Sequence, residues 1–312
     1  MTCAPACPPP QLDASLPHPA AKGPKLTDRT RLSLLLAPAL LVLGGLFLSG
    51  LGLTLLRSFR YMPALGLTEP DLAAYAAILS APGFLKSLAF SLWIATASTV
   101  LAATLALGAA LLLRQTFPGR AFVSFLVQLN LTIPHIVGAI GILYLVSQSG
   151  SFARLAHAAG LIATPAEFPV LTHDPYAIGI ILLYVWKELP FITLILLANL
   201  QTLGEDHEAV ARSLGASRWQ TFRHVLLPMI LPGLATASAL VFAFAFGAYE
   251  VPLVLGAHAP KALPVLAWQA WTDTDLATRP EAMAMAIVIA LIGLALLALV
   301  ARGLTAGERN AR

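Results

Sequence analysis

Charge is the scarcest property of this sequence. Only 11% of its 312 residues are charged and 58% are hydrophobic, whereas a soluble domain has about 25% charged residues. The mean hydropathy is +0.81. A water-exposed surface has to be coated by charged side chains, and this chain has too few of them. The composition therefore excludes an ordinary soluble protein and indicates a membrane protein.

Patterns that hold metals or nucleotides are also missing. The two cysteines, Cys3 and Cys7, are a lone pair without the remaining ligands of a structural zinc site. No glycine is followed by lysine, so the phosphate loop GxxxxGK[ST] is absent. His207 and Glu208 begin an HExxH pattern, but residue 211 is alanine. The sequence predicts no catalytic residue, no metal site and no cofactor bound by this chain, which is not expected to be an enzyme.

Long apolar runs are abundant. A helix needs about 20 apolar residues to cross the ~30 Å hydrocarbon core of a bilayer. The sequence therefore predicts an all-α integral membrane protein with six transmembrane helices. Their ranges are 33–56, 87–113, 121–147, 176–200, 233–256 and 282–301. The proline-rich start predicts a disordered cytosolic tail over 1–30, followed by a membrane domain over 31–303 and a cytosolic tail over 304–312.

The basic residues fall in short loops between the apolar runs. With the N-terminus in the cytosol, 12 Lys and Arg lie in cytosolic segments and 6 in external ones, while Lys187 lies within a helix. Lys and Arg are in excess on the cytoplasmic side of membrane proteins, so we expect both termini in the cytosol. This distribution is a topology signal and does not indicate a nucleic-acid partner.

The external loops are long enough to hold structure of their own. Residues 57–86 predict a short interfacial helix, because Leu72, Tyr75 and Ile78 have helical spacing. Residues 148–175 and 258–281 are either plain connectors or contacts for an extracytoplasmic partner. The sequence leaves both alternatives open.

The 201–232 segment is the longest predicted cytosolic loop, and its pattern is helical. Acidic residues cluster at its start, which suits the positive end of a helix dipole. Gly215 permits a turn, and Pro228 and Pro232 are expected to end the helical run. An apolar face is predicted from Ala209, Ala211, Leu214, Phe222, Val225 and Leu226. Two short helices joined by a glycine turn can fill a groove on a partner protein.

This segment resembles the EAA loop of ABC importer permeases, in which EAA is followed by three residues, Gly, nine residues, Ile, one residue and Leu-Pro. With Gly215 in the glycine place, Val225 takes the Ile place, and Leu227 and Pro228 follow in register. ARSLGAS, VLLPMILPG, LPFITLILLANL and FGAYEVPLVLG are also similar to this family, most of all to its polyamine, opine and phosphonate group.

The first part of the loop departs from the family pattern. The glutamate place falls on Ala209, and Glu208 comes one residue early. One residue turns a side chain by ~100° around a helix, so Glu208 is not equivalent in position to the family's glutamate. The resemblance implies that the loop couples the permease to its ATPase through Glu208, Ala209, Ala211, Arg212, Leu214, Gly215, Ala216, Phe222, Val225, Leu227 and Pro228.

The resemblance also implies a fold and partners. The expected fold is a five-helix, MetI-like importer-permease core, made by the second to sixth helices, plus an N-terminal helix that packs on a second permease subunit. That subunit is identical or homologous, and the other partners are a cytosolic ABC ATPase dimer, an extracytoplasmic solute-binding protein and membrane lipid. ATP is then used by the partner ATPase, the location is the bacterial inner membrane, and the substrate is a polyamine-like or related small solute.

Polar residues within the apolar runs are candidates for the substrate pathway, because charged groups at membrane depth cost roughly 2.5–3.5 kcal/mol each. Lys187 and Glu250 are predicted to form an interhelical pair. The alternative to a pathway role is a purely structural one in packing. The candidates are Asn130, His135, Lys187, Glu188, Tyr249 and Glu250.

Two other classes of protein remain open at this level. In an ion-coupled secondary transporter, the buried charges couple an ion gradient, but such carriers commonly contain inverted repeats and none is visible in this sequence. A polytopic structural or signalling protein needs no docking loop. The sequence favours the importer permease over both.

Overall fold

The computed structural model describes residues 26–203 and 206–310, and within that part of the chain every regular element is helical. Most of the predicted tail over 1–30, including Cys3 and Cys7, lies outside the described residues. The chain divides into two units, Met1–Gly52 and Leu53–Arg312. Of the first unit, the structure describes only helix α1 (Leu26–Ser58), which contains the predicted 33–56 span and continues into the second unit.

The second unit contains the remaining helices. In chain order they are η1 (Pro63–Leu65), α2 (Ala73–Ser80), α3 (Phe84–Leu113), α4 (Arg120–Leu129), η2 (Asn130–Thr132), α5 (His135–Val146), α6 (Ser151–Ala158), η3 (Pro165–Glu167), α7 (Ile178–Leu203), α8 (Asp206–Ser213), α9 (Arg218–Thr221), η4 (Phe222–Leu226), α10 (Leu227–Gly247), α11 (Glu250–Leu255), α12 (Leu263–Thr272), η5 (Leu276–Thr278) and α13 (Arg279–Asn310). The η4 element is a π-helical turn and the other η elements are 3₁₀ turns.

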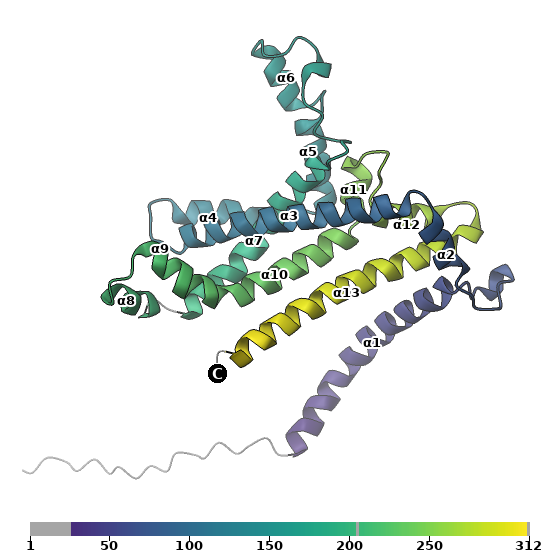
Figure 1. Ribbon diagram of the computed structural model, residues 1–312, viewed down its shortest axis with the longest axis horizontal. Helices are drawn as coiled ribbons and strands as arrows, with labels where there is room; N and C mark the ends of the chain where they lie inside the picture. Colours follow the sequence, from purple (N-terminus) through teal and green to yellow (C-terminus); the bar gives the residue numbers. More distant parts are fainter. Residues whose placement is uncertain (1–25, 204–205, 311–312) are drawn as a thin grey trace, which may run out of the picture. The chain divides into compact units, whose positions relative to one another are not determined.

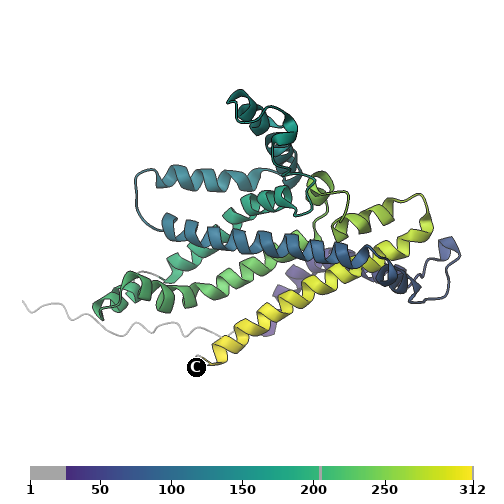
Figure 2. The ribbon, with the colours of Figure 1, turned by 45° about the horizontal axis from the view of Figure 1, so that its top comes forward.

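Four long helices form the bundle of this unit. Helix α3 packs on α7 and α10, and α10 packs on α7 and α13, so that the four run alongside one another (Figures 1 and 2). Close approach is possible because the buried face of α3 carries alanines, including Ala95, Ala102 and Ala106. Small residues of this kind let membrane helices approach backbone to backbone.

Six segments among the described residues are long and apolar enough to cross a membrane, as predicted. They are Leu35–Ser58, Phe84–Leu113, His135–Ala158, Ile178–Leu203, Arg218–Gly247 and Leu276–Leu304. The short helix predicted within 57–86 is present as α2, where Ile78 is buried and the Tyr75 hydroxyl lies 2.8 Å from that of Ser58.

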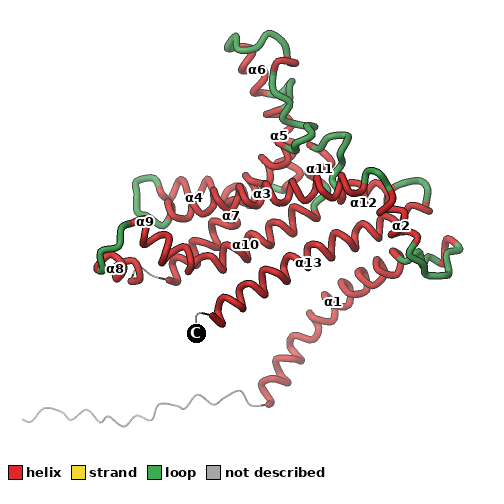
Figure 3. The backbone as a smooth tube through the Cα atoms, in the orientation of Figure 1, coloured by secondary structure: helices red, strands yellow, loops and turns green. Residues whose placement is uncertain are grey.

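The prediction of one continuous third helix over 121–147 is wrong. The segment divides into α4 and α5 at Ile133 and Pro134, which have extended backbone, and α5 with α6 leads away from the direction of α3 and α4 (Figures 1 and 3). Proline disfavours helical backbone in the residue before it and has no N–H to donate. The third candidate span is therefore His135–Ala158.

The fifth helix also differs from its predicted range of 233–256. Helix α10 begins earlier, at Leu227, and contains Pro232, so the expectation that Pro228 and Pro232 end the helical run is wrong. The π-helical turn η4 ends at Leu226, two residues before Pro228, and such turns accommodate proline within membrane helices. At the other end, α10 stops at Gly247, and Ala248 has extended backbone before α11 begins.

The start of α7 has no room for a side chain at Gly179. A Cβ atom there would lie 2.6 Å from the carbonyl oxygen of Leu171. We expect Gly179→Ala to lower the free energy of unfolding by about 1–3 kcal/mol, because backbone must move. Gly108→Ala is the matched control, since a Cβ in the middle of α3 meets open space and removing glycine from a helix gains about 0.5–1 kcal/mol. Equal melting temperatures for the two variants in detergent would contradict this prediction.

Candidate functional site

The 201–232 segment forms two short helices around a glycine turn, as predicted. Gly215 adopts a left-handed conformation (φ +86°) after α8, and its N–H donates to the carbonyl of Arg212 at 3.0 Å. Ser217 and Gln220 then form a capping box that starts α9. Because α9, η4 and α10 follow one another without a break, the second helix of this pair continues directly into a long helix of the bundle.

Glu208 faces the protein interior. Its carboxylate pairs with the guanidinium of Arg114, which directly follows α3, and with that of Arg212 at 3.2 Å. The Glu208 side chain is only 7% exposed, whereas that of Arg212 is 58% exposed. The carboxylate is therefore used within this chain, where it fixes α8 to the end of α3. Arg114 was not among the predicted site residues, because nothing local in the sequence relates it to a helix 94 positions away.

The predicted apolar face of this segment is divided between two sides. Phe222 and Leu226 pack against the buried cluster that α3, α7 and α10 share, whereas Leu214 is 82% exposed. Val210 and Trp219, which the sequence analysis did not single out, are exposed as well. Of the other predicted residues, Ala209 and Pro228 are exposed, and Ala211, Ala216, Val225 and Leu227 are partly buried.

A buried lysine closes the break in the third helix. Lys187 donates from Nζ to the carbonyl oxygens of Asn130 at 2.7 Å and Ile133 at 2.6 Å. The Asn130 carbonyl is the one that Pro134, four residues later, cannot serve. The Asn130 side-chain amide donates in turn to the carbonyl of Trp186. Lys187 and Asn130 therefore have a structural role, and the predicted pair between Lys187 and Glu250 is wrong.

His135 and Glu188 form a second polar contact, between α5 and α7. His135 Nε2 lies 3.0 Å from Glu188 Oε1, and the imidazole also contacts the ring of Phe244 with centroids 4.8 Å apart. Glu188 is the eleventh residue of α7, about 15 Å from the start of that helix. This pair therefore lies near the middle of the 26-residue helix α7.

Glu250 and Tyr249 lie at the break between α10 and α11 and are exposed. The Tyr249 ring stacks on that of Trp268 with centroids 6.0 Å apart. Among the described residues, no hydrogen bond or ion pair involves the Glu250 carboxylate. No group of three potential metal-ligating side chains comes together in the described part of the chain.

The geometry thus combines a multi-pass helical bundle, an exposed helix pair at one end and polar groups at a helix break. These features define a membrane transport subunit. The family model for the binding-protein-dependent transport system inner membrane component matches residues 98–308, and the chain belongs to this family. It is the permease subunit of an ABC importer and a multi-pass inner-membrane protein. As a transport subunit it is not an enzyme and binds no cofactor, because ATP is used by a partner ATPase.

Individual relatives agree with this assignment. The chain is 30% identical over 241 residues to the molybdenum transport system permease protein ModB of Mycobacterium tuberculosis, covering 75% of this chain and 87% of that protein. It is 31% identical to the molybdate/tungstate permease WtpB of Thermococcus kodakarensis, covering 69% and 78%. It is also 30% identical to the thiamine permease ThiP of Escherichia coli, covering 67% of this chain and 38% of that longer protein.

Solved structures confirm the fold. A bacterial alginate ABC transporter has a chain that superimposes with a TM-score of 0.71 at 18% identity, covering 88% of this chain and 95% of that chain. The MetNI methionine ABC transporter in an inward-facing conformation gives a TM-score of 0.51 at 21% identity, covering 72% and 93%. The MetI-like fold expected from the sequence is thereby confirmed.

The contact between Glu208 and Arg114 predicts an asymmetric response to substitution. Arg114→Gln leaves a buried carboxylate with only the exposed Arg212 as partner, and should lower stability by on the order of 3 kcal/mol. Arg212→Gln removes an exposed partner and should cost about 1 kcal/mol or less. Both changes can be followed by the melting temperature of the purified protein in detergent.

The double variant Glu208→Gln with Arg114→Gln is the control for this pair. It has no unpaired charge in the interior, so we expect it to be more stable than Arg114→Gln alone. Additive losses in the double variant would show that the two side chains do not act together.

Proposed function

We propose that the 201–232 segment docks the chain on its ATPase and that the helix break at Glu250 lines the substrate pathway together with a second permease subunit. The docking role is supported by the exposure of Leu214, Val210 and Trp219 at the end of the bundle where α8 and α9 lie (Figure 1). Large apolar side chains exposed on a helix pair favour burial in a groove of a partner.

The charges on this surface indicate which charges the groove of the partner should carry. Arg212, Arg218 and Arg223 belong to the same segment and are exposed, whereas Glu208 is buried among its own partners. An ATPase that binds here therefore needs an apolar groove with an acidic rim. The Glu208 carboxylate would not reach that partner, because it is committed to Arg114.

The same contacts suggest how movement of the ATPase reaches the membrane. The helix pair is continuous with α10 on one side and is attached to the end of α3 through Arg114 on the other. A displacement of α8 and α9 would thus act on two helices that pack on each other. Rigid helices transmit such displacements with little loss, which suits a switch between outward-open and inward-open states.

The topology that accompanies this proposal has both termini in the cytosol and the opposite end of the bundle outside. The solute-binding protein would then meet the external end, where α2 and α12 lie, and the arm of α5 and α6 that leaves the bundle (Figure 1). The arm formed by α6 and the following loop exposes Phe152, Leu155 and Leu161, which favours a contact over a plain connector.

The substrate class is proposed from Glu250. Lys187 and the His135–Glu188 pair are satisfied within the chain. The carboxylate of Glu250, at the break between α10 and α11, is therefore the candidate charge for binding a solute. The stacked rings of Tyr249 and Trp268 lie beside it. A carboxylate next to aromatic faces favours a small organic cation, and we propose a thiamine-like or polyamine-like solute.

The relatives named above include permeases for a cationic solute and permeases for an anionic one. Thiamine carries a positively charged ring, whereas molybdate is an anion that the Glu250 carboxylate would repel. The exposed acid therefore supports the organic cation over the oxyanion for this chain.

Docking can be tested by substitution of the exposed apolar residues. Leu214→Asp and Trp219→Ala should each reduce co-purification of the ATPase about tenfold or more, because each removes a large apolar contact worth at least about 1.5 kcal/mol. Leu161→Asp is the matched control, since Leu161 is 77% exposed and lies in the arm after α6. Unchanged ATPase retention in both variants would contradict the docking surface.

The pathway role of Glu250 can be tested by radiolabelled uptake into proteoliposomes. Glu250→Gln should lower kcat/KM for thiamine or a polyamine about tenfold, as expected for the loss of one charge contact, while ATPase retention stays unchanged. Glu69→Gln, in the exposed external loop, is the control. If cation uptake survives Glu250→Gln, or falls equally in the control, Glu250 has no contact with the solute.

A further inference from the structure

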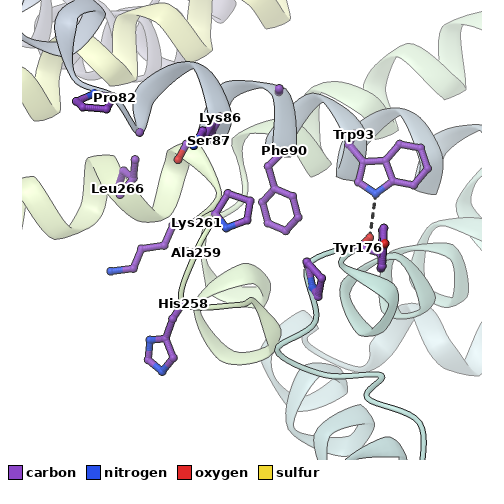
Figure 4. Close-up of a pocket in the computed structure, with 14 residues that line it drawn as sticks. Pro82, Lys86, Ser87, Phe90, Trp93, Tyr176, His258, Ala259, Lys261 and Leu266 are labelled. Carbon is purple, nitrogen blue, oxygen red and sulfur yellow. Dashed lines mark hydrogen bonds between the residues drawn. The ribbon is translucent and has the colours of Figure 1, made fainter.

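A large cavity lies at the end of the bundle opposite to the 201–232 segment. Its volume is about 1100 Å³, and it is lined by the start of α3, by the loop before α7, by residues 258–261 and by α12 (Figure 4). Phe90, Trp93 and Leu266 contribute apolar walls. The Trp93 indole is held in place by a hydrogen bond from Nε1 to the carbonyl oxygen of Tyr176 at 2.9 Å.

The two charged groups that line this cavity among the described residues, Lys86 and Lys261, are both basic. The imidazole of His258 also lines it, and among the described residues no carboxylate does. Lys261 donates from Nζ to the Gln269 side chain at 2.9 Å, which leaves two further N–H donors on its ammonium group. A cavity with cationic groups and no lining counter-charge favours an anionic ligand.

The position of the cavity along α3 indicates that the anionic ligand also has a long apolar part. From the cavity, an exposed and mainly apolar stripe continues along this helix through Ala89, Trp93 and Val100, and Val100 is 58% exposed. Thr96, which is also exposed, adds one small hydroxyl to this stripe. Fourteen residues separate Lys86 from Val100, or about 21 Å along a helix. One leaflet of a ~30 Å hydrocarbon core is about 15 Å thick, so the stripe is long enough to lie along an acyl chain through the whole leaflet.

We propose that this cavity binds an anionic phospholipid. The headgroup phosphate lies among Lys86, His258 and Lys261, and one acyl chain follows α3 from Trp93 to Val100. Lysine and tryptophan are the side chains that anchor proteins at the level of lipid headgroups. An acidic loop of a soluble partner matches the charges, but it cannot follow the stripe into the hydrocarbon region.

The test measures lipid retention by native mass spectrometry on the full-length protein purified in detergent. The protein is equilibrated with phosphatidylglycerol and phosphatidylcholine that carry the same acyl chains. The wild type should retain phosphatidylglycerol in preference to phosphatidylcholine. Lys86→Gln and Lys261→Gln should each lower this preference about fivefold, as expected for the loss of one basic residue near an anionic headgroup.

Matched variants separate charge from folding. Lys86→Arg and Lys261→Arg keep the charge and should keep the preference, and Arg154→Gln, which removes a basic residue of the α6 arm, should leave it unchanged. Every variant is used only where it keeps the melting temperature of the wild type. A short-chain, water-soluble phosphatidylglycerol should compete weakly, because it lacks the apolar half of the ligand.

Four results would overturn the proposal. They are equal retention of both lipids by the wild type, an undiminished preference in the double Lys86→Gln and Lys261→Gln variant, an equal loss in Arg154→Gln, and displacement of the lipid by inorganic phosphate at similar concentrations. Cross-linking of Lys86 to another polypeptide in native membranes, with no lipid retained, would also overturn it and would identify a protein as the occupant.

Discussion

An apolar interior offers no water to backbone N–H and C=O groups, and this constraint governs where the chain departs from helix. The break at Pro134 removes the helical N–H partner of the Asn130 carbonyl, which accepts instead from the N–H of Ile133 at 3.2 Å. The ammonium group of Lys187 donates to the same carbonyl and to that of Ile133. One buried charge thereby allows α5 to leave the direction of α4. The cost of burying that charge is offset only while both carbonyls accept from it, so Lys187 and the break depend on each other.

A second buried charge joins the helix pair α8–α9 to the bundle. Glu208 is enclosed between Arg114 and Arg212, and α9 runs through a π-helical turn into α10. The helix pair thus has two rigid attachments, one ionic and one covalent. An engaged ATPase would act on both α3 and α10, and the glycine turn between α8 and α9 would set the angle at which the pair meets its partner.

The ionisable groups of the bundle fall into two kinds. Lys187, Glu188, His135 and Glu208 are satisfied by neighbours within the chain, and they stabilise helix contacts. Glu250, Lys86 and His258 are exposed and Lys261 is partly buried. The last three line the cavity beside the start of α3, and these four side chains are available to other molecules. In the proposals above, the first kind determines the shape of the permease, while the second recognises its solute and its lipid.

The sequence by itself determined the class of fold, because apolar runs of membrane length and the bias of basic residues are properties of the linear chain. It also determined the glycine turn at Gly215, since left-handed backbone has a local signature. Only the tertiary structure decided the partners of the charges. Lys187 and Glu250 were predicted to pair, and Glu208 had no predicted contact with Arg114, because partners from separate helices depend on how those helices pack. The same holds for the break at Pro134: a proline permits either a kink or an end of the helix, and the packing of Lys187 selects between them.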